Sequence, residues 1–93
     1  MGGNPPAEVI ALQALAWIAG RDDVMAAFLG ATGLATADLR RSTDDPEVLA
    51  AVLDFLLTDD GWITAFCGDA GLPPDMPMRA RAALPGGGGI HWT

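Results

Sequence analysis

The chain has 93 residues, 51% of them hydrophobic, and its five basic and 12 acidic residues give a formal net charge of −7. Such acidity disfavours nucleic acids and anionic membrane surfaces as partners, because both are bound through clustered cations. One cysteine and one histidine supply neither an internal disulfide nor a zinc site, and the longest apolar stretch is too short to cross a bilayer, so we expect a cytoplasmic protein without a cofactor.

The composition favours helices over strands, because alanine and leucine are abundant and tyrosine is absent. No segment alternates with period two, and no hairpin turn lies between β-branched residues. The sequence therefore predicts an all-α fold, a small single-domain bundle of five to six short helices. We expect the bundle to span residues 7–85, between a flexible lead at 1–6 and a glycine-rich disordered tail at 86–93.

The first predicted helix covers residues 6–19 and follows two prolines, which fix the backbone before a helix begins. Glu8 lies in the first turn, where the helix dipole favours an anion, and Gly20 is the expected stop. Apart from Glu8, the only polar side chain is Gln13, about 140° away around the helix axis. Large apolar residues therefore spread over most of this helix.

Two shorter helices follow. Asp22 is the expected N-cap of the second helix and Gly33 its left-handed C-terminal residue. Gly30 weakens the interior of this helix, and we expect it to allow a close helix crossing. The third helix is capped by Thr36 and turns Leu39 inward.

The fourth predicted helix, at about 46–58, begins with a strong signal, an aspartate N-cap followed by proline. At 100° per residue its polar side chains share one narrow stripe with an alanine, and large apolar side chains fill the rest of the circumference. The stripe consists of Glu47, Ala51, Asp54 and Thr58. A helix with this pattern is surrounded by other elements, so we expect it to be the central helix of the bundle.

Two more helices complete the predicted bundle. Asp59 or Asp60 caps the fifth helix, which ends at Gly71. Asp75 caps the last helix, in which Pro77 is tolerated because it falls in the first turn.

The apolar first helix is the difficulty, because a bundle this small is expected to enclose only one helix completely. Part of the first helix is then exposed, or covered by another chain, and a contiguous exposed apolar patch marks an interaction surface. The alternative is that its alanines (11, 14, 16 and 19) form the exposed face and its large residues turn inward. The candidate interaction face comprises Ile10, Leu12, Trp17, Phe28 and Trp62.

Residues for catalysis or metal binding are scarce, and we expect none to act. Cys67 follows Phe66 on an apolar helix, where a small buried thiol is the usual case, and His91 lies in the predicted tail. Asp54 falls on the polar stripe, which favours a solvated carboxylate over a perturbed one. We therefore expect a protein that is not an enzyme, although an activity of unrecognised type stays open.

The stretch FLGATGLATADLRR is a weak candidate for a helix-turn-helix motif. A DNA-reading helix is usually longer and has a basic face, whereas Asp38 and the net charge of −7 oppose binding to DNA. Arg40 and Arg41 are more simply cations at the C-terminus of a helix.

The order of several segments resembles a bacterial family called domain of unknown function 3572. The segments are AEVIALQALAWIA, FLGATGL, DLRR, VLAAVLDFLL, GLPP and ARAALPG, over roughly residues 7–86. The most specific part is VLDFLL after its acidic residue and proline. The resemblance implies a small all-helical cytosolic protein and brings no activity, substrate or catalytic residue.

Two functions follow from these patterns. The leading hypothesis is a non-enzymatic interaction module that uses an apolar helical face to bind another protein or a second copy of itself. The alternative is a transcription-associated DNA-binding domain built on the helix-turn-helix candidate.

Overall fold

The computed structural model of the chain describes residues 6–41 and 43–84. This part of the chain contains helices and turns and no β-strand, which confirms the predicted all-α bundle. Its six helices are α1 (Ala7–Ala19), α2 (Asp22–Thr32), α3 (Thr36–Arg41), α4 (Pro46–Leu56), α5 (Asp60–Ala70) and α6 (Met76–Ala82). The predicted lead and tail lie, apart from Pro6, outside the described residues, so the limits of the domain stay a prediction.

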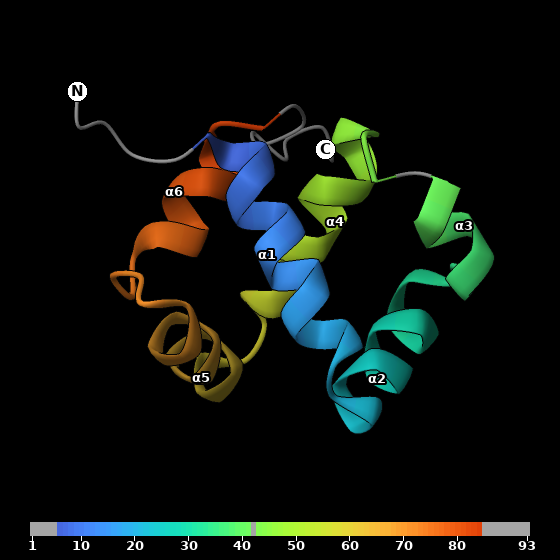
Figure 1. Ribbon diagram of the computed structural model, residues 1–93, viewed down its shortest axis with the longest axis horizontal. Helices are drawn as coiled ribbons and strands as arrows, with labels where there is room; N and C mark the ends of the chain where they lie inside the picture. Colours follow the sequence, from blue (N-terminus) through green and yellow to red (C-terminus); the bar gives the residue numbers. More distant parts are fainter. Residues whose placement is uncertain (1–5, 42, 85–93) are drawn as a thin grey trace.

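Two helices share the centre of the bundle. In Figure 1, α1 crosses in front of α4, with α5 and α6 on one side and α2 and α3 on the other. α1 packs against α2, α4, α5 and α6. α4 packs against α1, α2 and α6, and its Phe55 also stacks on Trp62 of α5. α4 lies at the centre, as predicted, and α1 lies there beside it, but α1 is not completely enclosed, because Val9 and Leu12 are exposed.

The start and the faces of α4 follow its sequence. The Asp45 carboxylate accepts a hydrogen bond from the backbone N–H of Glu47 at 2.9 Å, and Pro46 occupies the first turn, where its missing N–H costs nothing. Six residues are buried: Leu49, Ala50, Val52, Leu53, Phe55 and Leu56. The predicted polar stripe is the least buried side of the helix, with Glu47 and Asp54 exposed. The helix ends at Leu56, two residues before the predicted end.

Only one side of α1 is buried. Its buried residues are Ile10, Ala11, Ala14, Leu15 and Ile18. At 100° per residue these five positions fill an arc of about 140°. Ala11 and Ala14 are both fully buried, so the helix presents small side chains to its neighbours and allows their backbones to approach closely. The alternative in which alanines form the exposed face is therefore wrong for these two residues.

Local sequence signals place most of the helix ends. Gly33 and Gly71 adopt φ values of 74° and 70° after α2 and α5, as predicted, and the Asp59 carboxylate caps α5 by accepting from the Trp62 N–H at 3.2 Å. The predicted cap of α2 is wrong by one residue, because α2 begins at Asp22 itself. The close crossing expected at Gly30 is also wrong, since a Cβ built there meets nothing within 4 Å.

The last helix begins differently from the prediction. The backbone carbonyl of Asp75 accepts from Arg79 N–H, and its side chain caps no backbone N–H of α6. The Asp75 carboxylate instead lies 3.5 Å from the guanidinium of Arg79. Pro77 lies in the first turn, as expected, and is buried with Met76 and Ala80. α6 thereby covers α1 and α4 with a short apolar face.

Candidate functional site

The exposed side of α1 carries unusual apolar residues. Val9 and Leu12 are 41% and 39% exposed, and among the described residues the only other large hydrophobic residue with comparable exposure is Met78. Residues three and four apart lie side by side on a helix, so Val9, Leu12, Gln13 and Ala16 form one continuous exposed strip. We call these four residues the α1 ridge.

The predicted interaction face does not form as a set. Ile10 and Phe28 are both fully buried in the core, so their assignment to a surface is wrong. Ile10 lies two positions from Leu12, about 200° around the helix, and this turns it inward when Leu12 faces outward. Phe28 is enclosed because its ring meets Phe55 of α4 edge-on, with the ring centroids 5.3 Å apart. Leu12 is exposed, as predicted.

Trp17 is half-buried and is held by several contacts. Its Nε1–H donates to Asp69 Oδ2 at 2.8 Å, and Arg21 Nη2 donates to the same oxygen at 3.1 Å. The Arg21 guanidinium lies 4.5 Å from the centre of the Trp17 ring. The Trp17 ring also meets the Phe66 ring of α5 at an interplanar angle of 67°. These contacts connect α1 to α5, so Trp17 has a structural role.

Asp69 accepts hydrogen bonds from both Trp17 and Arg21. The hydrogen bonds from Trp17 and then from Arg21 lower the pKa of the Asp69 carboxyl below its ordinary value. Asp69 lies 52 positions from Trp17 in the chain, and no helical spacing relates the two. Sequence reasoning missed this connection because it depends on how α5 packs against α1.

Trp62 belongs to a different aromatic group. Its ring stacks on Phe55 with the centroids 4.7 Å apart and an interplanar angle of 29°. Phe55 in turn meets Phe28, so three rings connect α2, α4 and α5. Trp17 and Trp62 therefore do not join Leu12 in one patch, and the α1 ridge is what the structure retains of the predicted face.

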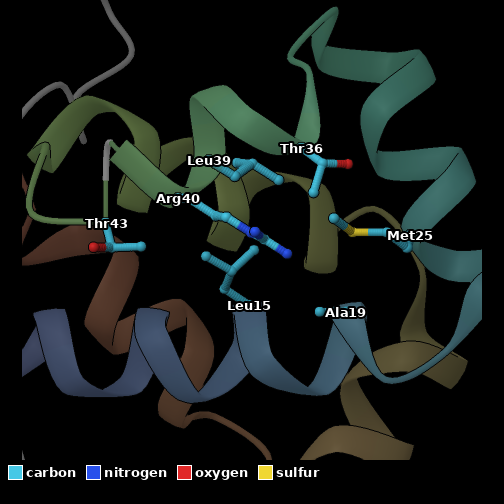
Figure 2. Close-up of a pocket in the computed structure, with 7 residues that line it drawn as sticks. All are labelled: Leu15, Ala19, Met25, Thr36, Leu39, Arg40 and Thr43. Atoms are coloured by element: carbon cyan, nitrogen blue, oxygen red, sulfur yellow. The ribbon is translucent and has the colours of Figure 1, made fainter.

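The α1 ridge lies between two hollows. One hollow, between α1 and α2–α3, has a volume of about 370 Å³ and is lined by Leu15, Ala19, Met25, Thr36, Leu39, Arg40 and Thr43 (Figure 2). The other, between α1 and α5, has a volume of about 240 Å³ and is lined by Gln13, Ala16, Trp17, Phe66, Asp69 and Ala70. We call them the Arg40 hollow and the Trp17 hollow.

Comparison with known proteins places this chain in a family. A family model described as "Protein of unknown function (DUF3572)" matches residues 5–87. The chain belongs to this family. The resemblance seen in its sequence segments is thereby confirmed. Among the curated proteins and the solved structures, none matches the chain. Because membership in DUF3572 carries no described activity, the function of this chain must be argued from its geometry.

In this DUF3572 protein the lone cysteine is inaccessible. Cys67 is 3% exposed, and burial raises the pKa of its thiol, with a further rise from the charge of Asp75. A raised pKa keeps the thiol protonated at neutral pH, and the protonated form is a poor nucleophile. His91, the partner weighed for catalysis, lies outside the described residues.

The helix-turn-helix candidate corresponds to α2, Gly33 and α3. α3 has only six residues, and one of its two arginines is engaged, because Arg41 pairs with Asp38 at 2.9 Å. The second, Arg40, lines the hollow beside α1. One cation is thus paired with a carboxylate and the other lies at the hollow, so α3 does not offer a basic face to DNA. The geometry adds no support for DNA binding. No helix in residues 6–41 and 43–84 is long and apolar enough to cross a bilayer.

Proposed function

We propose that this chain is a non-enzymatic protein-interaction module that binds its partner through the α1 ridge. The observation that carries the proposal is the joint exposure of Val9 and Leu12 on one side of a central helix, beside the exposed Ala16. A single exposed hydrophobic residue is ordinary, whereas adjacent ones bounded by hollows offer a partner both a ridge and grooves.

We propose a second copy of the chain as the partner, because two-fold homodimers are the commonest assemblies of such surfaces. A stable interface buries about 800 Å² of surface on each partner. The two partly exposed side chains of Val9 and Leu12 offer less surface than this. The rims of both hollows must then contribute, and the acidic net charge of −7 opposes the approach of two copies. We therefore expect a weak, reversible dimer that strengthens as added salt screens the charge.

Substitution of Leu12 by Glu tests the surface. We expect the mass of the wild-type chain, measured by light scattering or sedimentation, to rise with concentration towards that of a dimer. Leu12→Glu places a charge in the centre of the ridge and is expected to keep the chain monomeric, because burial of an unpaired carboxylate opposes association. Met78→Glu is the control, since it introduces the same carboxylate at a more exposed apolar residue of α6.

Two outcomes would contradict this function. One is a wild-type chain that stays monomeric at millimolar concentration in high salt and binds no hydrophobic-surface dye. The other is a dimer that Leu12→Glu leaves intact. A dimer that Met78→Glu disrupts and Leu12→Glu does not would move the interface from α1 to α6.

A further inference from the structure

The Arg40 hollow is apolar apart from one charged group. Leu15 and Ala19 of α1, Met25 of α2 and Leu39 of α3 form its apolar walls. In Figure 2 the Arg40 side chain extends across the hollow, and its guanidinium lies above Leu15 on the side of Met25. The hollow thus combines aliphatic walls with a single cation.

The two threonines at the edge of the hollow, Thr36 and Thr43, add little polar surface to its lining. In the view of Figure 2, Thr36 and Thr43 turn their methyl groups toward the hollow and their hydroxyl oxygens away from it. Their contribution to the lining is therefore mostly apolar. A ligand that fits would need one anionic group and an apolar body, without further polar groups.

Arg40 is unusual among the arginines of this chain. The other four each form an ion pair, with Arg21 on Asp69, Arg41 on Asp38, Arg79 on Asp75 and Arg81 on Asp54. Within the described residues the side chain of Arg40 has no such partner. Although the chain has 12 acidic residues, none of those in the described part forms an ion pair with Arg40. The guanidinium can therefore pair with the anionic group of a ligand.

We propose that the Arg40 hollow binds a small aliphatic monocarboxylate, with its carboxylate on the Arg40 guanidinium and its chain against the apolar walls. The guanidinium is a planar fork that matches a carboxylate with two parallel hydrogen bonds. A phosphate carries up to about two negative charges at neutral pH, and the hollow offers a single cation to balance them. Its volume of about 370 Å³ is near the lower end of ligand pockets, which suits a short acyl chain.

The binding test uses the full chain and a set of eight-carbon probes. Titration with octanoate, followed by calorimetry and by the NMR signals of Leu15, Ala19 and Met25, is expected to show saturable binding at this hollow. Octan-1-ol and octylamine keep the aliphatic chain without the anion, and we expect each to bind about tenfold more weakly. Along the series from butanoate to octanoate, affinity is expected to rise about fourfold per methylene group until the hollow is filled.

Two pairs of substitutions locate the site. Arg40→Gln is expected to weaken octanoate binding about tenfold, whereas Arg41→Gln, one residue away and outside the hollow, changes it less than about twofold. Ala19→Phe blocks the hollow and is expected to abolish binding. Ala16→Phe makes the same exchange one turn earlier, in the Trp17 hollow, and leaves binding intact.

The proposal is overturned if octanoate does not saturate the wild-type chain, if octylamine binds as tightly, or if Arg41→Gln weakens binding as much as Arg40→Gln. It does not depend on the protein partner of the α1 ridge, because neither Val9 nor Leu12 lines the hollow. Octanoate binding by Leu12→Glu separates the two, since this variant is expected to lose self-association and keep the ligand.

Discussion

Helices α1 and α4 are both strongly apolar and both lie at the centre of the bundle, yet their exposed sides carry different residues. α4 turns leucine, valine and phenylalanine inward, and its exposed residues include Glu47 and Asp54. α1 buries two alanines completely and leaves Val9 and Leu12 in contact with solvent. The total hydrophobicity of a helix therefore does not decide how much of it is enclosed.

The difference follows from the side of α1 that the neighbouring helices leave uncovered. α1 packs against four other helices, and small side chains on its buried face allow that crowding. Large residues elsewhere on α1 then face outward, because no helix covers that side in a single copy. In α4 the exposed residues coincide with the polar stripe, whereas the exposed side of α1 includes Val9 and Leu12.

The sharpest test of this comparison is a pair of leucine deletions. Leu53→Ala in α4 removes a fully buried side chain and is expected to lower the free energy of unfolding by about 3 kcal/mol, through lost burial and a remaining cavity. Leu12→Ala in α1 is expected to cost below about 1 kcal/mol, because the side chain is already 39% exposed. Urea denaturation of dilute samples measures both, and similar losses would contradict the contrast.

Enlarging an alanine tests the close packing of α1. Ala14→Leu adds volume at a fully buried position, and we expect it to lower the free energy of unfolding by about 2 kcal/mol through overpacking. Ala51→Leu makes the same change on the stripe of α4, which is only half-buried, and is expected to change stability by less than about 0.5 kcal/mol. If Ala14→Leu is tolerated as well as Ala51→Leu, then the alanines of α1 are not required for close approach.

The cap of α4 offers a smaller effect. Asp45→Ala removes the hydrogen bond to the Glu47 N–H and is expected to lower the free energy of unfolding by about 1 kcal/mol. Asp44→Ala removes the same charge from the neighbouring exposed residue and controls for electrostatics. Thermal denaturation compares the two variants. Equal effects would show that charge, and not capping, accounts for the change.

The smallest effect is expected at the connection between α1 and α5. The pKa of Asp69 is lowered from 3.8 in the folded chain, so its carboxylate stabilises the fold above this pH, and that contribution is lost as the pH falls through the lower folded value. We therefore expect the stability difference between wild type and Asp69→Asn to shrink on acidification below about pH 4. Trp17→Phe removes the leading hydrogen-bond donor and is expected to flatten this pH dependence. A stability difference between wild type and Asp69→Asn that grows in acid would contradict the lowered pKa of Asp69.

Much of the fold could be predicted because its signals act over a few residues. The Asp45–Pro46 start of α4, the Asp59 cap and the left-handed glycines at positions 33 and 71 each satisfy backbone groups of their own helix end. The ion pair between Asp38 and Arg41 is a further local signal, which the prediction from the sequence did not use. Asp38 and Arg41 are three residues apart, the spacing of neighbours on a helix surface, so their pairing leaves Arg40 as the arginine available to the hollow.

The candidate site was harder to predict because it depends on contacts between distant segments. Ile10 and Leu12 are both large and apolar and lie two residues apart, and the sequence provides no rule for which of them faces the core. The sequence predicts Trp17 as an exposed anchor for a partner, whereas in the structure its side chain contacts Asp69 and Arg21. A side chain's exposure is a property of what packs beside it.

The sequence by itself determined the helices, most of their ends and the burial of α4, because propensity, capping and the polar stripe are properties of short segments. Only the tertiary structure decided that α1 shares the centre, that Ala11 and Ala14 face inward, and that Arg40 lies over an apolar hollow. The physical reason is that helix packing selects one face of α1 from a nearly uniform apolar surface, and that choice depends on the shapes of four neighbouring helices.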